Sequence, residues 1–252
     1  MIINKFIKYK DNKYKVVIND SEVILYDDTI LKYNLLVNKN IDESLYSEIL
    51  DYNDELKYYY LASKYITKKL RSELEIRNYL SKYVSSVDVI NRIVDMLFKN
   101  NLINEELFAK SFIDDRLYLS NDGKEKIRLK LLEYGISNNI IFEYLDSIDD
   151  EIWINRIKKY IDKKIKTNHT SSKNQLKSKI LIDLTNLGYD NELVLSLLDS
   201  YVIIDEDIKK KEYLKIKKSL EKKYSGEILE YKIKERLYRK GFKDFEGDYY
   251  EE

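Results

Sequence analysis

The chain has 252 residues, and its 45 basic side chains balance its 45 acidic ones, so the formal net charge at pH 7 is zero. This balance excludes a global basic field for nucleic acid, and any surface of that kind must be local. The absence of cysteine excludes disulfides, cysteine–zinc sites and thiol nucleophiles, and the single histidine, His169, which we expect to face solvent, is too little for a His-rich metal site or a Ser–His triad.

No apolar run approaches the roughly 18 residues of a membrane span, and the opening MIINKFIKYK lacks the apolar stretch of a secretory signal. We therefore expect a soluble, cytoplasmic protein without membrane contact. The sequence has no proline and only six glycines, a composition that favours long, uninterrupted helices.

The exception is a predicted N-terminal unit over residues 1–53. The segments INKFIKYK, KYKVVIND and SEVILYDDTILKYN are rich in β-branched and aromatic residues, and turn-like DN and NDS breaks separate them. We predict two or three antiparallel strands, followed by a short helix over residues 41–50. A unit this small is marginal alone, so it is expected to pack on the helical body or on a partner. Asp27 and Asp28 are interpreted as a solvated turn rather than a metal site.

A motif recurs along the rest of the chain. The segments KIRLKLLEYGI (126–136), KILIDLTNLGY (179–189) and KIKERLYRKGF (232–242) share Lys-Ile, a leucine and a glycine followed by a bulky apolar residue, and the glycines are 53 residues apart. The apolar residues fall on one face of a helix, and the glycine follows where a left-handed C-terminal residue is needed. The motif is therefore predicted to be a helix with its stop signal.

A more distant copy, EIRNYLSKYVS (75–85), has Val84 in place of the glycine, and its helix opens with a capping box from Ser72 to Glu75. An amphipathic helix is predicted after each motif, and a helix that begins with acidic residues is predicted before each motif. Because carboxylates stabilise helix N-termini, we interpret these acids as caps rather than catalytic pairs. They are Asp54 and Glu55, Glu105 and Glu106, Asp149 to Glu151, and Asp205 to Asp207.

The repeating unit is thus helix, helix, glycine turn and helix, and it is predicted over residues 54–104, 105–148 and 149–204. A partial fourth unit over residues 205–252 lacks the third helix, and four aromatic residues are expected to cap the array in its place: Phe242, Phe245, Tyr249 and Tyr250. Because each unit alone has little surface to bury, stacking supplies a shared core. We predict a mainly α-helical fold of tandem three-helix repeats in an elongated, curved rod, with a small β unit at the N-terminus.

The run LINEELFAKSFIDDRLYLSNDGKEKIRLKLLEYGI (102–136) resembles the central motif of the RecX family. That motif has an acidic or asparagine-containing turn, Phe-Ala, an aromatic residue, an arginine, and Gly-x-x-x-Ile-Arg-x-x-Leu-x-x-x-Gly-Ile. The matching residues are Asn104, Phe108, Ala109, Phe112, Arg116, Gly123, Ile127, Arg128, Leu131, Gly135 and Ile136. The segment LRSELEIRNYL (70–80) resembles the family's first-repeat motif, and the β-containing N-terminus is similar to that of members from low-GC bacteria.

The resemblance, which covers nearly the whole chain, implies a regulator of the RecA recombinase that is not an enzyme and needs no metal or cofactor. It implies binding along the groove of the RecA–single-stranded DNA filament. The expected effects there are suppression of ATPase, strand exchange and stimulated repressor self-cleavage, in recombination, DNA repair and the SOS response. We expect a monomer whose partners are the RecA filament and, by direct contact, single-stranded DNA. The alternative is a helical-repeat protein that binds nucleic acid directly, without a recombinase partner.

The strongest local charge lies in residues 156–179, which contain nine basic residues and only one acidic residue, Asp162. Such a segment fits DNA phosphates or an acidic filament face, and its alternative is a solvated helix face and loop. The predicted contacts there are Arg156, Lys163, Lys164, Lys166, Lys173, Lys177 and Lys179. Elsewhere, guanidinium groups suit multi-donor contacts, with intramolecular ion pairs as the alternative; the predicted residues are Arg71, Arg77, Arg92, Arg116, Arg128 and also Lys126. Tyr59 is the tyrosine that we expect to be exposed for base stacking.

Overall fold

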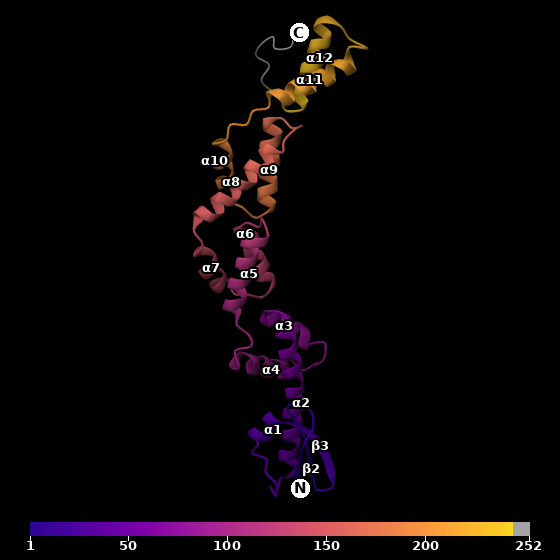
Figure 1. The fold of residues 1–252 in the computed structure, drawn as a ribbon, viewed down its shortest axis with the longest axis vertical. Coiled ribbons are helices and arrows are strands. Elements are labelled where there is room, and N and C mark those ends of the chain that lie inside the picture. Colours follow the sequence, from indigo (N-terminus) through magenta and orange to yellow (C-terminus); the bar gives the residue numbers. More distant parts are fainter. Residues whose placement is uncertain (244–252) are drawn as a thin grey trace. The chain divides into compact units, whose positions relative to one another are not determined.

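The computed structural model describes residues 1–243 (Figure 1). The chain divides into two compact units, which are described separately: unit 1 holds residues 1–109 and 134–136, and unit 2 holds residues 110–133 and those from 137 onward. Unit 1 contains β1 (Ile3–Lys8), β2 (Lys13–Ile18), β3 (Ser21–Tyr26), α1 (Asp27–Lys32), α2 (Glu43–Ile66), α3 (Glu73–Leu80), α4 (Val87–Lys99) and the start of α5 (Glu105–Leu119). Unit 2 contains the rest of α5, then α6 (Lys124–Glu133), α7 (Asn138–Asp146), α8 (Asp150–Lys166), α9 (Lys173–Asn186), α10 (Asn191–Asp199), α11 (Glu206–Leu220) and α12 (Gly226–Arg239).

The mainly helical fold with a small N-terminal sheet is as predicted. Within residues 1–243, no helix combines the length and the apolar character that a membrane crossing requires. The predicted sheet has three antiparallel strands in the order β1–β2–β3. Its buried residues Ile3 and Val16 share a core with Ile49 of α2, so the sheet rests on the helical body, as expected for so small a unit.

Asp27 and Asp28 do not form the predicted turn, because strand β3 runs directly into α1 and both carboxylates lie in its first turn. The helix dipole favours acids at that position. Asp28 also accepts a hydrogen bond from the Tyr60 hydroxyl. Burial, followed by this hydrogen bond, raises the pKa of Tyr60. Across residues 1–243, no group of three or more His, Cys, Asp or Glu side chains is placed to hold a metal ion.

Helix α2 is a single helix of 24 residues, which corrects both the predicted short helix over residues 41–50 and the predicted helix start at Asp54. Asp42 caps its start, since its side chain accepts a hydrogen bond from the Leu45 amide at 2.8 Å. Neither proline nor glycine interrupts the sequence that follows, so the helix continues through the predicted boundary after residue 53. The other acid clusters do lie in the first turns of α5, α8 and α11, as predicted.

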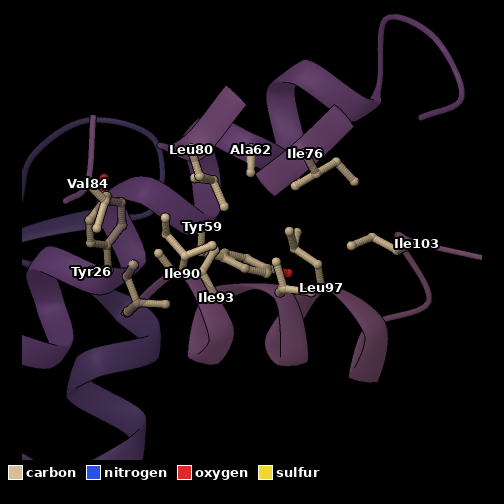
Figure 2. Close-up of a cluster of buried hydrophobic side chains, with 12 residues drawn as sticks. Tyr26, Tyr59, Ala62, Ile76, Leu80, Val84, Ile90, Ile93, Leu97 and Ile103 are labelled. Atoms are coloured by element: carbon tan, nitrogen blue, oxygen red, sulfur yellow. The ribbon is translucent and has the colours of Figure 1, made fainter. Parts of the chain in front are cut away.

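Helices α2, α3 and α4 share one hydrophobic core in unit 1 (Figure 2). The Tyr59 ring lies inside this core with 9% of its surface exposed, and its hydroxyl accepts a hydrogen bond from Asn100 Nδ2 at 2.9 Å. The prediction that Tyr59 is exposed for base stacking is therefore wrong. Helix α2 contacts α1, α3, α4 and β3, so it buries more than the single face that its sequence periodicity predicts.

The capping box predicted at α3 is present. Ser72 Oγ accepts the Glu75 amide at 3.2 Å, and the Glu75 carboxylate accepts the Ser72 amide at 3.2 Å. We expect Ser72→Ala to lower the free energy of unfolding by about 1 kcal/mol, because a helical amide loses its acceptor. Denaturant titration measures the loss. Ser81→Ala, at the exposed end of the same helix, is the control, and equal losses in the two variants would contradict the capping role.

The three glycine turns adopt the predicted left-handed conformation, with φ between 80° and 85°. Each turn also lies against the start of the motif helix in the preceding repeat; the neighbours are Leu74 for Gly135, Lys126 for Gly188, and Ser172 with Gln175 for Gly241. The apolar residue after each glycine is buried, namely Ile136, Tyr189 and Phe242. The glycine spacing therefore marks a packing contact as well as a helix stop. The other predicted capping aromatics, Phe245, Tyr249 and Tyr250, lie outside the described residues.

Candidate functional site

The predicted basic segment 156–179 spans most of α8, the loop 167–172 and the first half of α9. Trp153, Ile157 and Ile161 form the buried stripe of α8 and leave its lysines on the outer face. The last turn of α8 is rich in lysine, a position where the negative end of the helix dipole favours cations. His169, in the loop, is exposed as predicted.

A groove of about 580 Å³ lies between the end of α5 and the outer face of α8 in unit 2. Four basic side chains and no acidic side chain line it. We call it the α5–α8 groove, and the lining residues that matter below are Tyr118, Arg156, Lys159, Tyr160, Lys163 and Lys164. A second hollow of about 760 Å³ shares Tyr118, Arg156 and Lys159 with this groove. The arrangement provides positive charge beside aromatic surface, which is what a single-stranded polyanion with stacking bases requires.

Arg156 connects α8 to the end of α5 and so holds the two sides of the groove together. Its guanidinium donates hydrogen bonds to the carbonyl oxygens of Leu117 at 2.5 Å, Ser120 at 2.8 Å and Asp122 at 3.2 Å, and its Nε donates to the Tyr189 hydroxyl at 3.2 Å. The carbonyls belong to the end of α5 and the turn after it, where a helix leaves acceptors unsatisfied. Burial raises the pKa of Tyr189, and the neighbouring guanidinium opposes that shift. These contacts support a structural role for Arg156, whereas its contact with a partner stays a prediction.

We expect Arg156→Met to lower the free energy of unfolding by about 2 kcal/mol, because three carbonyl groups lose a charged donor while the length of the side chain is kept. Lys159→Met on the same helix is the control. Lys159 is exposed and belongs to none of the ion pairs within residues 1–243, so its loss should cost at most about 0.5 kcal/mol. Equal denaturation midpoints for the two variants would refute the structural role of Arg156.

The lysines of α8 differ in how freely they can meet a ligand. Lys164 donates a hydrogen bond to Asp183 at 2.8 Å, and this bond holds the pKa of Lys164 above, and that of Asp183 below, its ordinary value. Lys159, Lys163 and Lys166 are exposed and make no ion pair with any part of the chain that the structure describes. Lys158 is exposed and without an ion pair in the same way, but of these four lysines only Lys159 and Lys163 line the groove.

Tyr118 is the aromatic residue of the groove that the sequence analysis missed, and 86% of its surface is exposed. The buried face of α5 is set by Phe108, Ala109 and Ile113, and Tyr118 falls outside that stripe. An apolar residue off the buried face, just before the turn that ends the helix, is the signal that could have identified it. Tyr118 replaces Tyr59 as the candidate for stacking.

Most of the remaining predicted contacts of unit 2 lie outside the groove and pair with carboxylates of the same chain. Arg116 and Lys126 both pair with Asp122, at 3.7 Å and 2.8 Å. Arg128 pairs with Glu125 at 2.7 Å and lowers the pKa of that carboxyl. On α9, Lys177 pairs with Asp199 at 3.3 Å, the Lys173 amide donates to Asp205 at 2.6 Å, and Lys179 is exposed.

The predicted arginines of unit 1 also take part in intramolecular contacts. Arg71 pairs with Glu75 at 2.7 Å and lies over the Tyr65 ring, with 4.2 Å to its centroid. Arg77 pairs with Glu73 at 2.5 Å, and Arg92 pairs with Glu55 across to α2. Intramolecular ion pairs are the alternative to partner contacts that the sequence leaves open for these arginines. Their contact with a partner stays a prediction.

Comparison with known proteins gives a consistent result. The regulatory protein RecX of Lactococcus lactis subsp. cremoris strain MG1363 is 33% identical over 247 residues, which cover 94% of this chain and 92% of the relative. The regulatory protein RecX of Streptococcus sanguinis strain SK36 is 29% identical over 94% of this chain and 93% of the relative. No family model matches the chain.

Two solved structures share the fold. A crystal structure of regulatory protein RecX matches with a TM-score of 0.72 at 18% identity, over 79% of this chain and 99% of that chain. The crystal structure of RecX from Lactobacillus salivarius matches with a TM-score of 0.54 at 24% identity, over 59% of this chain and 98% of that chain. The repeats seen here are thus a known architecture.

Proposed function

The chain belongs to the RecX family of regulatory proteins, and from this premise we propose that it binds the RecA–single-stranded DNA filament and restrains its activities. The observation that carries the proposal is the α5–α8 groove in a chain of this family. Lys159 and Lys163 line this groove together with the exposed ring of Tyr118, and Lys166 adds an exposed, unpaired charge in the last turn of α8. A filament presents both phosphates and acidic protein surface, and either complements this charge.

The proposed role is that of a binding regulator and not of an enzyme. The relatives are named regulatory proteins, and the acidic clusters that resemble catalytic pairs in the sequence lie in the first turns of α5, α8 and α11. In such positions carboxylates stabilise the helix, which gives them a role without catalysis. ATP hydrolysis by the purified chain alone would contradict this part of the proposal.

A comparison of affinities tests the proposal. The chain is titrated against a labelled single strand and against the same strand coated with the host's RecA, at equal salt, because salt alone shifts such affinities strongly. We expect tighter binding to the coated strand, since a filament offers repeated contacts to one chain. Equal or weaker binding to the coated strand would refute the RecA partnership.

The second candidate function is direct binding of single-stranded nucleic acid without a recombinase. Tyr118 favours it, because an exposed ring beside lysines suits base stacking with little sequence preference. Tight binding to the naked strand, unchanged by RecA, would establish this function in place of the first.

A further inference from the structure

The N-terminal sheet of unit 1 has a second face, which points away from its core. Side chains alternate between the two faces of a sheet, and Phe6, Val16 and Leu25 occupy the face that packs on the core. Residues opposite each other in neighbouring strands share a face, so the strand register gives the members of the other one. We call it the outer sheet face, and its rows are Lys5, Val17 and Glu22; Ile7, Lys15 and Ile24; and Tyr9 with Lys13. None of these eight side chains is buried.

The composition of the outer sheet face is unusual for a surface in contact with water, which is ordinarily polar. Half of its residues are apolar, and Ile7, Tyr9 and Ile24 are 37%, 43% and 43% exposed. The other half consists of three lysines and Glu22, whose carboxylate pairs with Lys15 at 3.1 Å. The face therefore combines apolar surface with an excess of positive charge.

Tyr9 is the aromatic residue of this face, and lysines surround it. The Nζ atoms of Lys10 and Lys15 each lie 5.7 Å from the centroid of its ring. Lys13 is its neighbour on the next strand, since the Tyr9 amide donates a hydrogen bond to the Lys13 carbonyl at 3.0 Å. Within residues 1–243, Lys5, Lys10 and Lys13 form no ion pair, so their charges are available to a ligand.

We propose that the outer sheet face is a second contact surface for single-stranded nucleic acid, on which a base stacks on Tyr9 and phosphates meet Lys5, Lys10 and Lys13. Sheets with exposed aromatic residues bind single strands in this way in other folds. An acidic protein segment would match the charge, but it has no aromatic base to stack on the ring, so the face fits nucleic acid better. The face lies in unit 1 and shares no residue with the α5–α8 groove, so either surface can bind without the other.

Photo-cross-linking tests where a strand lies on the full chain. The probe is a single strand of about 12 nucleotides that carries 5-iodouracil, a base that couples to an aromatic ring in contact with it. Peptide mass spectrometry should find an adduct on Tyr9. Tyr83 is the internal control, because it lies in the same unit at 51% exposure, and no cation lies over its ring within the described part of the chain. Its yield should be about tenfold lower. A yield at Tyr9 no greater than that at Tyr83 would overturn the proposal, and an adduct on Tyr118 alone would do so while leaving the α5–α8 groove intact.

A charge variant tests the lysines. Lys5→Gln, Lys10→Gln and Lys13→Gln together should weaken binding to the naked strand about tenfold and lower the slope of log affinity against log salt by about 2. Fluorescence anisotropy over a series of salt concentrations measures both quantities. The matched control removes the same charge from exposed positions on and just after α2 of the same unit, with Lys57→Gln, Lys64→Gln and Lys68→Gln. Equal weakening in the two variants would overturn the proposal.

A ring variant keeps the test independent of the lysines. Tyr9→Leu retains every charge and an apolar side chain at an exposed position, and it should weaken binding to the naked strand about tenfold. Unchanged affinity in both the ring variant and the lysine variant would refute the surface. Weakening by the lysine variant that appears only on a RecA-coated strand would identify an acidic protein as the partner and would likewise overturn the proposal.

Discussion

Replacing Gly188 with alanine is expected to lower the free energy of unfolding by about 3 kcal/mol, because two costs add at this position. The backbone has a φ of +85°, where a side chain costs roughly 1 kcal/mol. The added Cβ would also lie 2.6 Å from the Cβ of Lys126, at the contact between two repeats. Backbone on both sides is held there by the hydrogen bond from the Gly123 amide to the Leu187 carbonyl, at 2.6 Å. Relieving such overlap costs about another 2 kcal/mol.

Gly226→Ala is the matched control for this prediction. Gly226 also has a positive φ, of +56°, but an added Cβ would meet nothing within 4 Å. It therefore carries the backbone cost of about 1 kcal/mol without the steric cost. Denaturant titration of both variants separates the backbone cost from the steric cost. If Gly188→Ala lowers the free energy of unfolding no more than Gly226→Ala does, the packing of the repeats does not depend on this contact.

Reversing the charge of Lys159, Lys163 and Lys166 together is expected to weaken binding to the RecA–DNA filament about 100-fold at moderate salt. If all three contact phosphates, their loss should also reduce the slope of log affinity against log salt by about 2. Lys164 is unsuitable for such a variant, because it forms an ion pair with Asp183 and its replacement would change folding as well as binding. Fluorescence anisotropy of a labelled filament over a series of salt concentrations measures both quantities.

Lys57→Glu, Lys64→Glu and Lys68→Glu form the control for charge reversal. These three lysines are exposed residues of unit 1, outside the groove, and the variant has the same net charge as the first. A long-range effect of net charge would weaken binding equally in both variants. Equal weakening would therefore remove the α5–α8 groove as the site, whereas a selective loss in the first variant supports it.

Much of the fold follows from local sequence rules. The glycine spacing predicted the repeats, because a left-handed residue after an apolar stripe is a signal that needs no knowledge of distant contacts. The capping box at Ser72 and Glu75 is likewise a contact between near neighbours, and the structure confirms it. Helix α2 was missed as a single helix because acids at Asp54 and Glu55 imitate a helix start, while Glu55 instead pairs with Arg92 of α4.

The candidate site was less accessible to prediction, because it depends on which residues the fold brings together. The basic run on α8 is visible in the sequence, but nothing local shows that Tyr118 lies beside it. The different roles of the basic residues also depend on tertiary contacts, which the sequence does not show. Arg156 is used inside the fold, Lys164 is paired with Asp183, and Lys163 remains available, although all three have equal charge in the sequence.

ATP hydrolysis by the host's RecA on single-stranded DNA, titrated with this chain, tests the proposed function most directly. We expect hydrolysis to fall at ratios well below one chain per RecA protomer, because a regulator bound along a filament affects several protomers at once. The variant with Lys159, Lys163 and Lys166 reversed should require a much higher ratio. Unchanged hydrolysis at one chain per protomer, together with tight binding of the chain to naked single strands, would contradict a role as a RecA regulator.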